Sequence, residues 1–164
     1  MTSKTIDRRA FFFAGAGAAS LLLFGRSSSS AGAPTHFTVK RSTAQWKQIL
    51  GQQRYYILRK AGTERPFTSP LLGEHRKGKF LCAGCALPLF DSATKFESGT
   101  GWPSFWRPLP RAVVERADRS LLMERTEVLC ARCGGHLGHV FNDGPRPTGL
   151  RYCMNGLALK FRPA

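Results

Sequence analysis

Hydrophobic residues occur along the chain in short runs that are separated by Gly, Pro, Asp and Ser. From residue 80 onward, runs with residues that favour strands alternate with turn-forming residues. Such runs occupy residues 79–82, 113–116, 121–129 and 150–161. We therefore expect a mainly β domain with antiparallel strands, and we find no internal repeat.

A helical pattern precedes this β region. Ser42 and Gln45 have the spacing of a capping box, in which each side chain binds the backbone N–H of the other residue. Three apolar residues then fall on one face of a short helix: Trp46, Ile49 and Leu50. A second helical segment is predicted over residues 52–59, so short helices are expected before the strands.

Residues 1–33 have the pattern of an export signal. Arg8 and Arg9 precede an uncharged run over 11–24 that is too short to span a bilayer comfortably. Paired arginines before a weakly hydrophobic stretch are typical of twin-arginine signals, and the A-x-A pattern before Pro34 suggests cleavage after Ala33. A retained N-terminal anchor is the alternative. The expected organisation is a signal at 1–33, a linker at 34–41 and one domain at 42–164, in the periplasm or elsewhere outside the cytoplasm.

The composition is that of a globular domain with a basic surface. Hydrophobic residues make up 42% and charged residues 21% of the 164 residues, so the body is expected to fold. The formal net charge is +15, and most of it lies outside the leader. A basic surface favours anionic partners, but we find no basic helix and no stripe of alternating basic and aromatic residues. We therefore expect no nucleic-acid partner.

Four of the five cysteines form two C-x-x-C pairs, Cys82 with Cys85 and Cys130 with Cys133. Two residues between thiolates let both sulfurs of a tight turn bind one ion, and two such turns supply four ligands to a tetrahedral Zn²⁺. We predict one structural Zn²⁺ per chain, because four protein ligands leave no open position for substrate. A pair of disulfides is the alternative that an oxidising compartment favours.

Cys153 is the cysteine left over. Strand alternation places Arg151, Cys153 and Asn155 on one face of a β-prone segment, with Tyr152 and Met154 on the other. A guanidinium beside a thiol favours the nucleophilic thiolate, and the Asn155 amide is able to orient a substrate or water. An inert cysteine in a half-buried strand explains these residues equally well.

Several motifs together carry a resemblance to a known family. They are Gly62-Thr63-Glu64-Arg65-Pro66-Phe67, Leu87-Pro88-Leu89-Phe90, the segments 98–105, 135–145 and 151–155, and both cysteine pairs. In this order they closely resemble the methionine (R)-sulfoxide reductase family, between Trp46 and Phe161. The resemblance implies two small antiparallel sheets in a barrel-like arrangement, and a domain that reduces methionine (R)-sulfoxide in oxidised proteins.

The resemblance also implies the catalytic roles. Cys153 would attack the sulfoxide sulfur, which releases methionine and leaves a sulfenic acid on the enzyme. His136, His139 and Arg151 would donate protons or hydrogen bonds to the departing oxygen. The two histidines are three positions apart, so a regular strand would place them on opposite faces. We therefore expect a bend at Gly138, or one histidine outside the strand.

Substrate binding is implied for Trp102 and Phe141. Trp102 would form a flat apolar wall for the methyl group of the substrate, and Asn155 would belong to the catalytic set. Glu64 and Asp143 are expected to support the site.

One residue departs from a pattern found in part of the family. Some members have a second, resolving cysteine where this chain has Thr100. With four other thiols assigned to metal, we expect the Cys153 sulfenic acid to be reduced by an external thiol, such as a thioredoxin-like protein. We expect the protein to be a monomer. The rival hypothesis is an exported structural zinc domain with an inert Cys153.

Overall fold

The structure, a computed structural model, describes residues 36–120 and 124–164. The predicted signal at 1–33 lies outside these residues, so the twin-arginine signal, its cleavage and the domain boundaries stay predictions. Within the described ranges, no helix has the length and apolar character needed to cross a bilayer.

The helix α1 (Thr43–Lys60) begins at the predicted capping box. The Ser42 side chain accepts from the Gln45 N–H, and the Gln45 side chain accepts from the Ser42 N–H. At Gly51 the backbone leaves the helical region, with φ 68° and ψ 176°. Because glycine adopts positive φ without a steric penalty, α1 is two short helical segments joined at a kink, as the sequence predicts. Its buried residues are Trp46, Leu50, Ile57 and Leu58.

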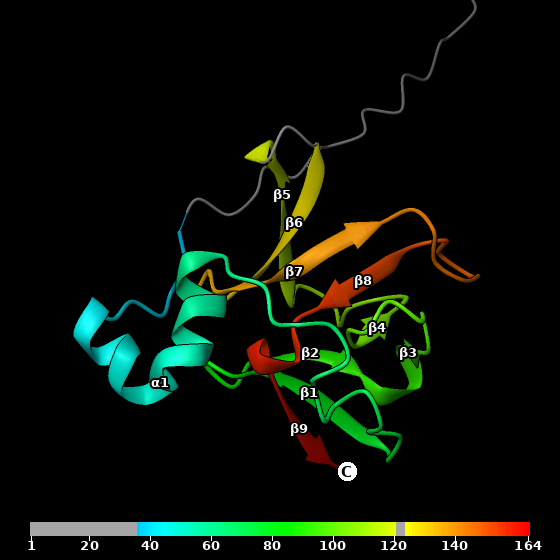
Figure 1. Ribbon diagram of the computed structural model, residues 1–164, viewed down its shortest axis with the longest axis horizontal. Helices are drawn as coiled ribbons and strands as arrows, with labels where there is room; N and C mark the ends of the chain where they lie inside the picture. Colours follow the sequence, from blue (N-terminus) through cyan, green and yellow to red (C-terminus); the bar gives the residue numbers. More distant parts are fainter. Residues whose placement is uncertain (1–35, 121–123) are drawn as a thin grey trace, which may run out of the picture. The chain divides into compact units, whose positions relative to one another are not determined.

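The strands form two antiparallel sheets, which confirms the predicted fold class (Figure 1). The smaller sheet has the order β2-β1-β9, made of β1 (Gly78–Cys82), β2 (Pro88–Asp91) and β9 (Leu159–Pro163). The larger sheet has the order β3-β4-β8-β7-β6-β5, made of β3 (Lys95–Phe96), β4 (Ser104–Phe105), β5 (Val113–Asp118), β6 (Arg125–Cys130), β7 (His136–Phe141) and β8 (Arg151–Met154). The short 3-10 helices η1 (Ser92–Thr94) and η3 (Gly156–Ala158) connect strands.

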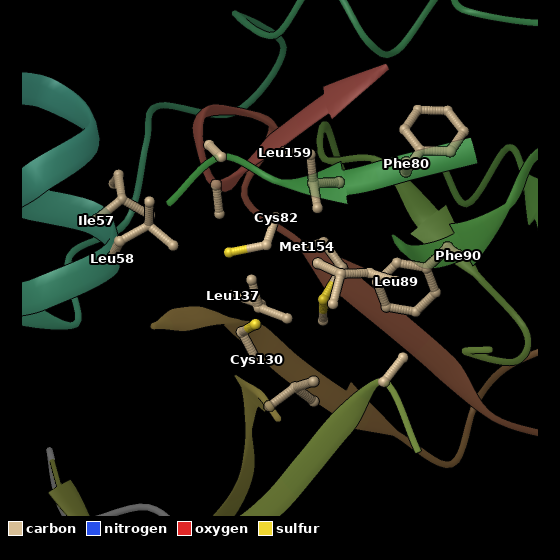
Figure 2. Packing of buried hydrophobic residues seen from close by; sticks show 14 of the residues in the cluster. Ile57, Leu58, Phe80, Cys82, Leu89, Phe90, Cys130, Leu137, Met154 and Leu159 are labelled. Atoms are coloured by element: carbon tan, nitrogen blue, oxygen red, sulfur yellow. The ribbon is translucent and has the colours of Figure 1, made fainter. Parts of the chain in front are cut away.

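Aromatic side chains pack the two sheets together. The Phe105 ring of β4 stacks on Phe90 of β2 at 4.3 Å and meets the edge of Phe80 of β1 at 4.9 Å between ring centroids. All three side chains are fully buried. Figure 2 shows Ile57 and Leu58 pointing from α1 toward the part of the core that contains Cys82 and Leu137. The buried cysteines Cys82, Cys130 and Cys133 are part of the same core.

Strand β8 lies inside the larger sheet, with β4 on one side and β7 on the other. Tyr152 and Met154 point into the hydrophobic core, as strand alternation predicts. Arg151 and Cys153 therefore project from the opposite face of the sheet. This alternation decides which face carries the polar residues.

Candidate functional site

Cys153 lies beside residues from three other segments. It pairs directly with His139 of β7 and with Ser104 of β4, and directly opposed residues of antiparallel strands share one face of the sheet. Its Sγ is 3.6 Å from the Thr100 Oγ1. The Ser98 hydroxyl lies 2.8 Å from that of Thr100 and 2.7 Å from that of Ser104, so a chain of hydroxyl groups leads to the thiol. Ser98 and Ser104 were not predicted as site residues.

Arg151 places a fixed positive charge on the same face. Its Nε and one terminal nitrogen donate to the two Asp143 carboxylate oxygens, each at 2.8 Å. The guanidinium also lies over the Phe141 ring, 4.4 Å from its centroid. The Asp143 carboxylate, and to a lesser extent Cys153, raise the pKa of Arg151 above its usual value. Arg151 therefore stays charged next to the thiol, while Asp143 and Phe141 hold its orientation.

A bulge in β7 brings the two histidines together. The pairing of β6 with β7 shifts between Val128 and Leu129, which face Gly138 and His136. The His136 and His139 rings are consequently 5.4 Å apart, edge to face. A Cβ at Gly138 would lie 2.1 Å from the Cys153 carbonyl oxygen, so only glycine allows this approach of β7 to β8. The predicted bend at Gly138 is confirmed.

Each histidine is held by a carboxylate. His136 Nδ1 is 2.7 Å from Glu127, a residue of β6 that also accepts from Arg116 at 2.6 Å. His139 Nε2 is 2.9 Å from Asp118 of β5. Only the cross-strand pairing of β5, β6 and β7 brings these carboxylates to the histidines. Neither carboxylate was predicted as a site residue, although an acidic residue inside the β-prone run 121–129 was a signal for Glu127.

These contacts shift the pKa values of the groups around the histidines. Burial alone would raise the pKa of Glu127, but the hydrogen bonds from His136 and Arg116 bring it below its usual value. Burial lowers the pKa of His139, and the Asp118 contact only partly opposes this effect. His139 is therefore neutral at pH 7. His136 uses its Nδ1 to contact Glu127. Its other ring nitrogen, Nε2, is buried and has no hydrogen-bond partner among the described residues.

Trp102 is hydrogen-bonded to Glu64, which lies in the segment between α1 and β1. The indole Nε1 donates to the Glu64 carbonyl at 3.2 Å, and the Glu64 N–H donates to the Asn155 Oδ1 at 2.9 Å. The Asn155 Nδ2 in turn donates to the Leu137 carbonyl at 3.1 Å. The Asn155 amide thus links backbone groups of two segments, which is a supporting position, and its catalytic role stays a prediction.

The Glu64 carboxylate is itself buried. It accepts from the backbone N–H groups of Gly156 and Leu157, at the start of η3. Burial raises the pKa of Glu64, and these two hydrogen bonds only partly oppose the shift. Glu64 therefore connects the end of β8 with the segment that carries Trp102, which agrees with its expected supporting place.

The four cysteines of the C-x-x-C pairs converge on one point. Their Sγ atoms all lie within 4.8 Å of one another, with 3.7 Å between Cys82 and Cys133 and 3.5 Å between Cys85 and Cys130. A tetrahedral ion with metal–sulfur bonds of about 2.3 Å requires sulfurs about 3.8 Å apart, so the set fits a metal ion. No disulfide joins any of the five cysteines, so the structure does not support the disulfide alternative. Cys153 is not one of the four.

The metal site joins the two sheets. Cys82 ends β1 of the smaller sheet, and Cys130 ends β6 of the larger one. Both side chains are fully buried. An ion held by this set links the ends of strands from both sheets, which is the position of a structural metal.

Comparisons with known proteins identify the family. The SelR domain model matches residues 50–163. The protein named peptide methionine sulfoxide reductase MsrB from Leptospira interrogans is 55% identical over 128 residues, which are 77% of this chain and 98% of the relative. The protein of the same name from Agrobacterium fabrum is 55% identical over 126 residues, 76% of this chain and 93% of the relative.

A third protein of this name, from Thiobacillus denitrificans, is 54% identical over 124 residues, which cover 75% of this chain and 94% of the relative. The matched region holds all the residues that surround Cys153 and both cysteine pairs. The chain therefore belongs to the SelR-domain family, together with proteins named peptide methionine sulfoxide reductase MsrB.

Proposed function

We propose that this protein reduces methionine sulfoxide in oxidised proteins to methionine, with preference for the R epimer, and that Cys153 is the nucleophile. The observation that carries the proposal is the position of Cys153. It is the one thiol outside the metal set, and it shares a sheet face with His139 and Arg151. The names of the relatives supply the reaction class, and the resemblance of the motifs supplies the epimer.

The reaction transfers one oxygen atom from substrate to enzyme. The Cys153 thiolate attacks the sulfoxide sulfur and forms a sulfur–sulfur bond. The protonated oxygen then passes to the Cys153 sulfur as the methionine sulfur–oxygen bond and the sulfur–sulfur bond break, which releases methionine and leaves a sulfenic acid on Cys153. Methionine sulfur is reduced by two electrons, and the cysteine sulfur is oxidised by two. The departing oxygen needs a proton, which a histidine or water supplies.

The surrounding residues have distinct roles in this step. Arg151 stabilises the thiolate and, later, negative charge on the oxygen. His136 and His139 lie on the same side of the site and supply hydrogen bonds, and their carboxylate partners fix the ring orientations. The partly exposed Trp102 ring offers an apolar surface for the substrate methyl group, and Phe141 lies under the Arg151 guanidinium.

An external thiol completes the cycle. The four other cysteines belong to the metal set, and the loop before β4 places Thr100, which cannot form a disulfide, 3.6 Å from the Cys153 sulfur. A first donor thiol attacks the sulfenic sulfur and releases water, and a second donor thiol then frees Cys153 and leaves the donor oxidised as a disulfide. A dithiol protein or a small dithiol satisfies this balance. The monomeric state stays a prediction.

For the metal set we propose Zn²⁺. Four thiolates at tetrahedral spacing are the donor set that zinc accepts in structural sites, and they leave no position for substrate. We also propose export through the twin-arginine route. The support is the Arg8 and Arg9 pair before the apolar run at 11–24, and mass spectrometry of the exported protein tests both export and cleavage.

The decisive experiment uses Cys153→Ser with separated epimers of a methionine sulfoxide peptide. The wild-type protein, supplied with a small dithiol, should reduce the R epimer, and Cys153→Ser should reduce neither. Both proteins should bind one zinc ion, which shows that the variant is folded. Activity in Cys153→Ser would overturn the assignment of the nucleophile, and an inactive wild type would favour the structural zinc domain.

A further inference from the structure

Phe67 is unusual among the described residues because it has the largest exposed fraction of any large hydrophobic side chain. The side chain is 70% exposed, against 56% for Tyr56 and 47% for Ile49. We propose that Phe67 is a substrate-binding residue that contacts an apolar side chain beside the methionine sulfoxide in a polypeptide. This inference rests on the proposed function, and it adds a determinant of substrate class to the same site.

The backbone of Phe67 has a conformation that a bulky residue rarely adopts. Its φ is +62°, in a turn that contains Pro66. Positive φ in a turn after proline is the usual position of glycine or asparagine, because a Cβ is crowded there. A strained backbone that carries an exposed aromatic ring is more readily explained by binding than by stability.

The turn is fixed next to the proposed methyl wall. The Phe67 N–H donates to the Gly101 carbonyl at 2.8 Å, and the Trp102 indole donates to the Glu64 carbonyl at 3.2 Å. A Cβ at Gly101 would lie 2.9 Å from the Phe67 Cδ2, so the ring lies directly over Gly101. Two hydrogen bonds therefore join the segments 64–67 and 101–102. The Phe67 ring lies over the loop that also carries Trp102 and Thr100, and the Thr100 hydroxyl is 3.6 Å from the Cys153 sulfur.

The occupant that fits this place is the residue beside the oxidised methionine in an extended chain. Neighbouring residues of an extended chain are about 3.3 Å apart along its axis, so side chains one or two positions away lie about 3 to 7 Å from the methionine sulfoxide, and one of these would contact Phe67. Free methionine sulfoxide has no such side chain. We accordingly expect Phe67 to strengthen the binding of polypeptide substrates and to have no effect on the binding of free methionine sulfoxide.

The test compares Phe67→Gly with the wild type on three substrates. Two are peptides with methionine sulfoxide flanked by Leu or by Ser on both sides, and the third is N-acetylmethionine sulfoxide. Phe67→Gly should lower kcat/KM for the Leu-flanked peptide about fivefold to tenfold, the size of one aromatic contact, mainly through KM. The Ser-flanked peptide should lose less, and the single residue should be reduced as before.

Two further variants and a stability measurement separate binding from a structural role. Phe67→Tyr keeps the ring and should retain the preference for Leu, and Ile49→Ala removes an exposed apolar side chain on α1 and should change nothing. Because glycine suits the backbone at this position, the thermal unfolding midpoint of Phe67→Gly should be unchanged or higher.

The outcomes are distinct. Equal losses on all three substrates, or an unchanged preference for Leu, would overturn the proposal while the reductase function stands. A lowered unfolding midpoint would show that the ring stabilises the fold, which also overturns it. Failure of the wild type on every substrate would instead reject the proposed function itself.

Discussion

Glu127→Gln tests how the site is held in place. The Glu127 carboxylate is 8% exposed, and one of its oxygens contacts His136 Nδ1 at 2.7 Å while the other accepts from Arg116 at 2.6 Å. A glutamine has a single acceptor oxygen. If that oxygen contacts one of the two partners, His136 or Arg116, the amide N–H₂ group faces the N–H of the other partner. The substitution therefore removes the charge and weakens the contact with either His136 or Arg116, with almost no change in volume.

The structure sets the size of the expected loss. The contact with His136 is buried, and a hydrogen bond to a buried charged group contributes about 2 kcal/mol. The Arg116 side chain is 62% exposed, so that ion pair adds less than about 1 kcal/mol after solvent screening. We expect Glu127→Gln to lower the free energy of unfolding by about 2 to 3 kcal/mol at pH 7.

The pH dependence gives a second, independent check. Hydrogen bonds from His136 and Arg116 lower the pKa of Glu127 from its usual value of 4.5, although burial alone would raise it. A carboxylate whose pKa is lower in the folded state stabilises the fold above the unfolded-state pKa, and this contribution is lost as the pH falls through the folded-state pKa. The difference in stability between wild type and Glu127→Gln should therefore shrink below about pH 4.5.

Urea unfolding of the metal-loaded proteins, followed by circular dichroism, measures both effects. The matched control is Glu124→Gln, because the Glu124 side chain is 76% exposed and its ion pair with Arg119 has a distance of 3.8 Å. This control should change stability by less than about 0.5 kcal/mol. A loss for Glu127→Gln within that same range, or a difference that grows in acid, would refute the role given to the buried carboxylate.

Three other predictions follow from the geometry. Gly138→Ala should destabilise the protein by more than about 2 kcal/mol and reduce activity, because the new Cβ would meet the Cys153 carbonyl at 2.1 Å, and urea unfolding with a reductase assay checks it. Thr100→Cys places a thiol where an oxygen lies 3.6 Å from the Cys153 sulfur, so turnover should yield an internal disulfide that mass spectrometry detects, whereas the wild type should yield a sulfenic acid that dimedone traps. A strong chelator should unfold the protein, because structural Zn²⁺ contributes about 10 to 16 kcal/mol in small cysteine sites, and loss of the β signal together with released zinc is the readout.

Local signals in the sequence were sufficient for the elements that depend on near neighbours. The capping box predicted the start of α1, and strand alternation placed Tyr152 and Met154 in the core with Cys153 on the other face. The spacing of the histidines conflicted with a regular strand, and that conflict predicted the irregularity at Gly138. Each inference needed only a few adjacent residues.

Features that depend on strand pairing were not predictable in this way. Glu127 and Asp118 meet the histidines only because β5, β6 and β7 pair in one register, and a register is a long-range property. The strands β3 and β4 have two residues each, too few to show an alternating pattern. The Asn155 amide was expected to face substrate, but its two backbone contacts became visible only when the loop at Glu64 was placed beside β7.

The interior position of β8 has a consequence for how the enzyme exchanges its two partners. Strand β8 is paired with a strand on each side, so the Cys153 sulfur has a fixed position. A nucleophile on a mobile loop, by contrast, is able to move between two binding sites. The oxidised substrate and the reductant must therefore bind next to the same sulfur one after the other, and each one excludes the other while it is bound. We therefore expect ping-pong steady-state kinetics, with inhibition by an excess of either reactant, because both reactants use one binding place.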